Sequence, residues 1–225
     1  MPEEITLLQQ GLEAVEEMTV MGFSIYQGQL EGQAVLLAQC GIGKVNAALL
    51  TMLLVQQGAE QIIFTGVAGG LAPSLSVGDI VVSADAMQHD VDVSALGYRL
   101  GHIPDELIHW PADPQLRALA LACAQELADV HSMEGRIVSG DQFVADRDKV
   151  VWLRQTFQAC CVEMEGASVA QVCSRCEVPF VIIRSISDTA DYDASLSFQE
   201  FTPLAAERAN RLVRAMLQRW PATGS

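Results

Sequence analysis

The sequence predicts an α/β protein in which helices cover both faces of a central, largely parallel sheet. Short apolar and β-branched segments alternate along the chain with longer segments in which small and apolar residues recur at helical spacing. Several of the short segments are apolar throughout rather than alternating, which is typical of strands covered on both faces. Together these observations indicate a three-layer α/β/α architecture.

Helical periodicity predicts helices at residues 46–57, 115–127, 164–177 and 201–217. Strands are predicted between Gly, Pro or Asp residues, at residues 34–38, 62–65, 80–83, 137–139 and 180–187. Residues 88–114 follow neither pattern, and long irregular segments of compact domains are often functional. We expect one domain over residues 1–219 and a disordered tail at residues 220–225.

The composition argues against two classes of partner. The 225 residues carry a net charge of −15, and this charge repels phosphate backbones and anionic lipid surfaces. No apolar run is long enough to cross a bilayer. We therefore expect neither nucleic acid nor membrane as a partner. Because 50% of the residues are apolar and only 18% are charged, the composition favours a homo-oligomer.

The six cysteines lie in apolar segments without the spacing of a disulfide scaffold or a zinc ribbon. No segment at the start resembles a signal peptide, so we expect free thiols in a cytoplasmic protein. His89, Asp90 and Asp92 bring charge together in the irregular segment, but their spacing matches no known metal loop. We interpret them as solvated loop charges and expect no metal.

Ligands of open α/β sheets bind beyond the carboxyl ends of the strands, so polar residues that follow buried strands are the first candidates. Gly41-Ile-Gly-Lys44 follows such a strand, but it lacks the third glycine of a dinucleotide fingerprint and the spacing of a P-loop. A tight turn from this strand into the next helix is the better explanation. Thr65-Gly-Val-Ala-Gly-Gly-Leu71 fits a ligand cradle and a plain turn equally.

Two further segments carry ionisable side chains at strand ends. Glu163 and Glu165 lie where a strand meets a predicted helix, where carboxylates either complement the helix dipole or bind sugar hydroxyls. The strand at residues 180–187 brings Arg184, Ser187 and Asp188 toward its carboxyl end. Asp188 fits either a capping residue or a general acid in an apolar site.

Eight segments occur in the order, and with nearly the spacing, of one protein family. They are Glu3-Glu-Ile-Thr-Leu-Leu8, Gly41-Ile-Gly-Lys-Val45, Thr65-Gly-Val-Ala-Gly-Gly-Leu-Ala-Pro73, Val77-Gly-Asp-Ile-Val-Val-Ser83, Val138-Ser-Gly-Asp-Gln-Phe143, Val162-Glu-Met-Glu165, Arg184-Ser-Ile-Ser-Asp188 and Leu196-Ser-Phe198. On these segments the chain resembles the bacterial methylthioadenosine/S-adenosylhomocysteine nucleosidases. The ordered set is far more specific than any single motif.

The resemblance implies a nucleoside phosphorylase-like fold with a mixed sheet flanked by helices, usually as a homodimer and without a cofactor. It implies hydrolysis of the N-glycosidic bond of 5′-methylthioadenosine, S-adenosylhomocysteine and also 5′-deoxyadenosine, which releases adenine in methionine salvage. Asp188 matches the general acid that protonates adenine N7, Glu4 the residue that activates water, and Glu165 the residue that holds the ribose hydroxyls. Two carboxylates and a proton donor would then surround a cationic transition state.

The resemblance also implies which residues bind the substrate. Ser187 orients the carboxyl group of Asp188, and Met164 packs under the ribose. The other matched positions are Phe143 and Val144 at the purine, Met1, Ile42 and Phe198 at the 5′-substituent, and Ile103 and Pro104 contributed by the partner subunit. The expected substrate-binding set is completed by Val67, Ala68, Gly69, Glu163 and Arg184.

The chain departs from the family pattern at two places. Relatives begin with a short hydrophobic strand that ends in Gly-Ala-Met before the glutamates, whereas this sequence begins at Met1-Pro-Glu-Glu4. We therefore expect this strand to be missing and Glu4 to lie near a terminus. Val67 stands where many relatives have serine, which removes a hydroxyl near the nucleophile.

Alternatives of other classes remain open. Phosphorolysis on the same fold is disfavoured because phosphorylases hold phosphate with several arginines, and the glycine-rich residues 41–45 and 65–73 contain none. A futalosine or aminodeoxyfutalosine hydrolase would share the catalytic residues. A non-catalytic nucleoside-binding protein would bind adenine compounds without turnover. An NAD oxidoreductase is the weakest alternative because its fingerprint is incomplete.

Overall fold

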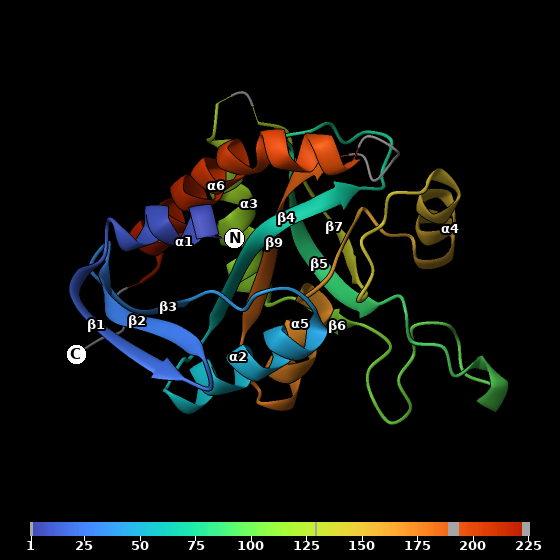
Figure 1. Ribbon diagram of the computed structural model, residues 1–225, viewed down its shortest axis with the longest axis horizontal. Helices are drawn as coiled ribbons and strands as arrows, with labels where there is room; N and C mark the ends of the chain where they lie inside the picture. Colours follow the sequence, from blue (N-terminus) through green and yellow to red (C-terminus); the bar gives the residue numbers. More distant parts are fainter. Residues whose placement is uncertain (1, 129, 189–193, 222–225) are drawn as a thin grey trace.

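The computed structural model describes residues 2–128, 130–188 and 194–221, and of residues 2–4 and 194–199 it describes the backbone alone. The described helices are α1 (Pro2–Gln9), α2 (Lys44–Gln56), α3 (Pro114–Gln125), α4 (Arg147–Phe157), α5 (Gly166–Arg175), α6 (Ala194–Arg219) and the short 3-10 helix η1 (Ser94–Leu96). The described strands are β1 (Glu13–Val20), β2 (Phe23–Leu30), β3 (Gln33–Ala38), β4 (Ile62–Gly70), β5 (Ile80–Gln88), β6 (Trp110–Pro111), β7 (Ser132–Ser139), β8 (Cys161–Glu163) and β9 (Phe180–Asp188) (Figure 1).

Within the described residues the strands form two sheets. β1, β2 and β3 form an antiparallel sheet, and the others form a six-stranded sheet in the order β6-β5-β7-β8-β4-β9. In the larger sheet, β4–β9, β5–β7 and β7–β8 are parallel pairs, whereas β4–β8 and β5–β6 are antiparallel. β5 also pairs with β9, so the sheet closes on itself. The predicted mixed sheet is confirmed.

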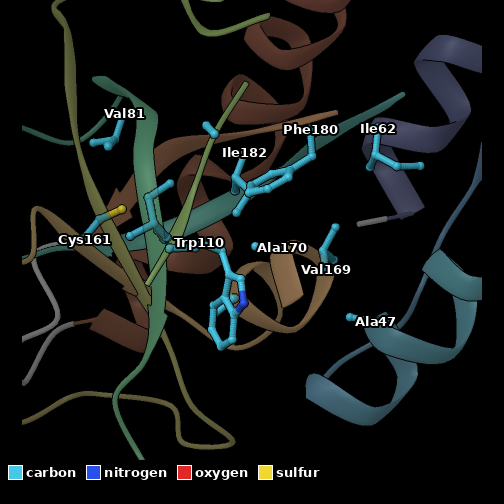
Figure 2. Packing of buried hydrophobic residues seen from close by; sticks show 14 of the residues in the cluster. Ala47, Ile62, Val81, Trp110, Cys161, Val169, Ala170, Phe180 and Ile182 are labelled. Atoms are coloured by element: carbon cyan, nitrogen blue, oxygen red, sulfur yellow. The ribbon is translucent and has the colours of Figure 1, made fainter. Parts of the chain in front are cut away.

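Both faces of the larger sheet are covered by helices (Figure 1). Ile80, Val82, Val181 and Ile183 pack with apolar residues of α3 and α6. The alternate residues of the same strands, Val81 and Ile182, belong to a second cluster that includes residues of α2 and α5 (Figure 2). Because successive side chains of a strand point to opposite faces, the unbroken apolar run of each strand serves both clusters.

The predicted strands and helices are all present, and all five predicted strands extend beyond the predicted ranges. β4 continues to Gly70 and β5 continues to Gln88, because the glycines and polar residues that seemed to end these strands remain in the ladder. Helix α6 begins at Ala194 and passes through Pro203, so the prediction that it starts at residue 201 was late. Helix α4 was not predicted. Its capping residue, Asp146, accepts a 2.8 Å hydrogen bond from the Lys149 N–H and is a helix-start signal that the prediction did not use.

The ladder brings the carboxyl ends of several strands to one edge of the sheet. Gly69 of β4 is paired with Asp188 of β9 and with Val162 of β8, and Ser139 of β7 is paired with Glu163. The segment between β5 and β6, which contains η1, extends away from the body of the protein (Figure 1). Among the described residues no helix is both long and apolar enough to cross a membrane. All six cysteines lie in the described part of the chain and are free thiols.

Candidate active site

Asp188 is the last residue of β9 and lies at the carboxyl edge of the sheet, with only 3% of its surface exposed. The hydroxyl of Ser187 donates a 2.8 Å hydrogen bond to Asp188 Oδ2. The same oxygen of Ser187 lies 3.5 Å from the carbonyl oxygen of Ala68 on β4. The contact fixes the rotamer of one buried carboxyl group, which is what a positioned proton donor needs.

Glu163 is a buried carboxylate that joins three parts of the site. Its Oε2 accepts hydrogen bonds from the backbone N–H groups of Glu165, over 3.0 Å, and Gly166, over 2.8 Å. Arg184 Nη2 lies 2.5 Å from the same oxygen, and the hydroxyl of Ser139 donates to Oε1. Glu163 therefore satisfies the first N–H groups of α5 and neutralises a buried guanidinium.

Arg184 is accommodated because its partner in the ladder has no side chain. Gly66 of β4 lies opposite Arg184 of β9, and a Cβ at Gly66 would overlap Nη1 of Arg184. The guanidinium carbon lies 4.3 Å from the centre of the Phe64 ring, a cation–π contact. Gly66, in the segment that fitted a ligand cradle and a plain turn equally, thus makes room for an arginine of the chain itself.

Glu165 immediately precedes α5, and its Oε1 accepts a 2.9 Å hydrogen bond from the N–H of Gly43. Gly43 has φ of 95°, a conformation that residues with a side chain adopt only under strain. Burial, and then the negative charge of Glu163, raises the pKa of Glu165 above its ordinary value. Burial and the charge of Glu165 also raise the pKa of the nearby Cys40 thiol to about 11, so Cys40 is un-ionised at neutral pH.

A sheet edge with a buried acid, a second carboxylate and a glycine turn is an arrangement that many chemistries share, so family membership must come from comparison. A family model described as the phosphorylase superfamily matches residues 1–218. The chain belongs to the phosphorylase superfamily. The predicted nucleoside phosphorylase-like fold is therefore confirmed, and solved nucleosidases at up to 40% identity confirm the predicted family.

The chain is similar to solved structures of nucleosidases and of a futalosine hydrolase. The 5′-methylthioadenosine/S-adenosylhomocysteine nucleosidase of Neisseria meningitidis, in complex with methylthio-immucillin-A, is 40% identical with a TM-score of 0.94, over 97% of this chain and 95% of that one. The corresponding nucleosidase of Colwellia psychrerythraea, in complex with adenine, is 38% identical with a TM-score of 0.93, over 96% and 91%. A futalosine hydrolase of Helicobacter pylori is 38% identical with a TM-score of 0.91, over 96% and 93%.

The other predicted substrate-binding residues lie around the same edge of this superfamily fold. Val67 and Gly69 are half-buried and Ala68 is buried at the carboxyl end of β4, and Met164 is half-buried between β8 and α5. The loop after β7 carries an exposed Phe143 beside a buried Val144. Ile42 is exposed in the turn that holds Glu165. The substrate roles of these residues remain predictions.

Ile103 and Pro104, which were predicted to reach a partner subunit, are half-buried in the segment between β5 and β6. Ile103 packs against the largest apolar cluster of its own chain. Met1 and the side chains of Glu4 and Phe198 lie outside the described part of the structure. Their assignments remain predictions.

Ile5 lines a hollow of about 310 Å³ together with Gln39 and with residues of the β1–β2 turn and β2. Gln39 directly follows β3 and leads into the turn that holds Glu165. The first turn of α1 therefore lies near the chain segment that enters the candidate site.

The prediction made for Asp90 is wrong. The sequence predicts a solvated loop charge at Asp90, but its side chain is only 15% exposed, and Lys44 Nζ lies 2.6 Å from its Oδ1. The adjacent His89 is buried as well. The available signal was that Lys44, Asp90 and Asp141 each follow closely on a strand, at the end where ligands bind.

Proposed function

We propose that this chain hydrolyses the N-glycosidic bond of 5′-methylthioadenosine and S-adenosylhomocysteine, and also of 5′-deoxyadenosine, and releases adenine. The observation that carries the proposal is the buried carboxyl group of Asp188, held by the Ser187 hydroxyl at the carboxyl edge of the sheet. The names of the relatives, one solved with adenine and one with methylthio-immucillin-A, support adenine nucleosides as the substrate class.

In the proposed reaction Asp188 donates its proton to N7 of adenine while the bond between C1′ and N9 breaks. Protonation makes adenine a better leaving group, and the ribose ring develops positive charge. Glu165 accepts hydrogen bonds from the ribose hydroxyls. Glu4 takes a proton from the water whose oxygen bonds to C1′. Carboxylates around a developing cation stabilise the transition state more than the ground state.

Adenine release from 5′-methylthioadenosine in phosphate-free buffer tests the assignment of the acid. We expect the parent chain to release adenine and the Asp188→Asn variant to be slower by about 10²- to 10⁴-fold, because an amide cannot supply the proton. A variant with full activity would show that another group protonates the leaving adenine.

Futalosine is a second candidate substrate because the Helicobacter pylori futalosine hydrolase is as similar as one of the nucleosidases, at 38% identity. The same catalytic residues would act on it. Competition between futalosine and 5′-methylthioadenosine for one enzyme preparation shows which of the two substrates the protein prefers. We expect the methylthio compound to have the higher kcat/KM, because the positions predicted around the 5′-substituent are apolar.

We further propose that the protein is a cytoplasmic homodimer. Val45, Leu49 and Met52 lie at helical spacing on α2 and are 69%, 40% and 38% exposed, which forms an apolar stripe on the surface. Cys176, at the end of α5, lies against Met52, with 3.8 Å between their sulfur atoms, and widens the stripe. Apolar stripes of this kind on the surface of a protein mark sites of association.

A further inference from the structure

Lys44 links the ends of three strands beside the candidate site. It follows the turn after β3, and its ammonium lies 2.6 Å from Asp90 Oδ1 and 2.9 Å from Gln88 Oε1, at the end of β5. The other oxygen of Asp90 accepts a 3.0 Å hydrogen bond from the N–H of Asp141, which follows β7. One lysine side chain and one carboxylate thus connect loops that are far apart in the sequence.

The pair between Lys44 and Asp90 is shielded from solvent. The two side chains are 18% and 15% exposed, so their attraction is screened less than that of a surface pair. Burial alone would raise the pKa of Asp90, but the hydrogen bonds and charge from Lys44 and the Asp141 N–H outweigh it and lower the pKa. Gln88 is held in turn, because its amide donates a 2.7 Å hydrogen bond to Gln171 on α5. The ammonium therefore has two fixed acceptors.

The backbone beside Lys44 contacts the proposed ribose-binding carboxylate. The N–H of Lys44 donates a 2.8 Å hydrogen bond to Asp141 Oδ1, and the preceding N–H, of Gly43, donates to Glu165 Oε1. Gly41 and Gly43 both have positive φ, at 77° and 95°. A turn with two glycines has many accessible conformations, so some contact outside the turn must select the one that points the Gly43 N–H at Glu165.

We propose that Lys44 is a positioning residue for the hydrolytic reaction: anchored on Asp90 and Gln88, it fixes the turn so that the N–H of Gly43 holds Glu165 ready for the ribose. The inference rests on the proposed function for its substrate. It also makes a claim about the substrate-free protein, namely that the anchor orders residues 40–46.

The test uses three variants of the full chain. Lys44→Met removes the ammonium and keeps the length of the side chain, and Lys44→Arg restores a cation that can reach the same acceptors. Lys149→Met is the matched control, because Lys149 is the only other lysine of the sequence. Its ammonium lies 4.1 Å from the centre of the Trp152 ring. The loss of Lys149 changes the net charge as much as the loss of Lys44 does.

Steady-state hydrolysis of 5′-methylthioadenosine is the first measurement. We expect Lys44→Met to lower kcat/KM by about 10- to 100-fold, because a small displacement of a substrate-positioning group has effects of that size. Lys44→Arg should recover most of the loss, and Lys149→Met should match the parent. The pH profile should also change, because the hydrogen bond from Gly43 lowers the pKa of Glu165 against the opposing effects of burial and Glu163.

Losing that bond should move the acidic limb of kcat/KM to higher pH in Lys44→Met. Among the described residues, the groups whose charge or hydrogen bonds act on Glu165 are Glu163, Arg184, Cys40 and the N–H groups of Gly43 and Met164. We expect Lys44→Met to change only the Gly43 contact among these. Lys44→Arg and Lys149→Met should leave all of them unchanged. An unchanged limb with reduced activity would mean that Lys44 acts in some other way and would overturn the proposal.

Hydrogen exchange of the substrate-free protein tests the proposal without activity. We expect faster exchange in peptides covering residues 40–46 for Lys44→Met than for the parent, Lys44→Arg or Lys149→Met, with the helices of the core unchanged. Equal exchange in all four proteins would overturn the positioning role whether or not the parent hydrolyses nucleosides. An inactive parent with the expected exchange would contradict the proposed function alone.

Discussion

The hydroxyl of Ser187 and that of Ser185 are both buried on β9, two residues apart, and differ in their partners. Ser187 donates to Asp188, whereas the Ser185 hydroxyl has no hydrogen-bond partner among the described residues. We expect Ser187→Ala to lower kcat for adenine release by about tenfold, since one hydrogen bond to an ionisable group is lost. Ser185→Ala is the matched control and should keep kcat within about twofold. Equal losses in the two variants would show that the strand, not the contact with Asp188, is what matters.

The role of single residues was only partly predictable from the sequence. Asp188 and Ser187 were located because they end a buried apolar strand and because the motif resembles a known family. The pairing of Asp90 with Lys44 was missed because the two residues are 46 positions apart and meet only when the ends of β3 and β5 come together. Glu163 and Glu165 looked alike in the sequence, since nothing local shows which carboxylate faces Arg184.

At the scale of elements, the start of α5 separates the functions of these two carboxylates. Glu163 pairs with buried Arg184, and we expect Glu163→Gln to lower the free energy of unfolding by about 3–5 kcal/mol, because it removes the carboxylate of a buried ion pair. Glu165→Gln should instead raise the free energy of unfolding at neutral pH. The raised pKa of Glu165 means that the folded protein binds this proton more tightly than the unfolded chain.

Ionised Glu165 therefore costs stability, and the cost grows as the pH rises from the ordinary pKa of 4.5 to the raised value and is constant above it. Glu165→Gln keeps an acceptor for the Gly43 N–H and removes this cost. Thermal unfolding as a function of pH should show the variant more stable than the parent at neutral pH, with the gain vanishing below pH 4.5. A gain that persists in acid would contradict the assigned pKa shift.

Elements with long buried apolar runs were predicted well, and exposed or very short elements were predicted poorly. β5 and β9 of the larger sheet begin with buried runs of apolar residues, and both strands were identified from that pattern. β1 reads Glu-Ala-Val-Glu-Glu-Met-Thr-Val and is mostly exposed, so it has no apolar face for a pattern to show. β8 has only three residues and is defined by its neighbours in the ladder.

At the scale of the whole molecule, the exposed stripe on α2 predicts association. We expect the parent to run as a dimer in size-exclusion chromatography with light scattering, and Leu49→Lys to shift it toward the monomer, because a charge in an apolar interface must be desolvated. Val151→Lys on α4 is the control, since Val151 and Leu49 are both 40% exposed. A parent that is monomeric at all concentrations would contradict the proposed homodimer.

We propose that the carboxyl edge of this sheet carries out hydrolysis of an adenine nucleoside. The most direct test is to identify, by mass spectrometry, both products formed from 5′-methylthioadenosine in the presence and in the absence of phosphate. We predict adenine and free 5-methylthioribose in both buffers, at equal rates. Formation of the sugar 1-phosphate, with a rate that depends on phosphate, would contradict the claim and assign the chain to phosphorolysis.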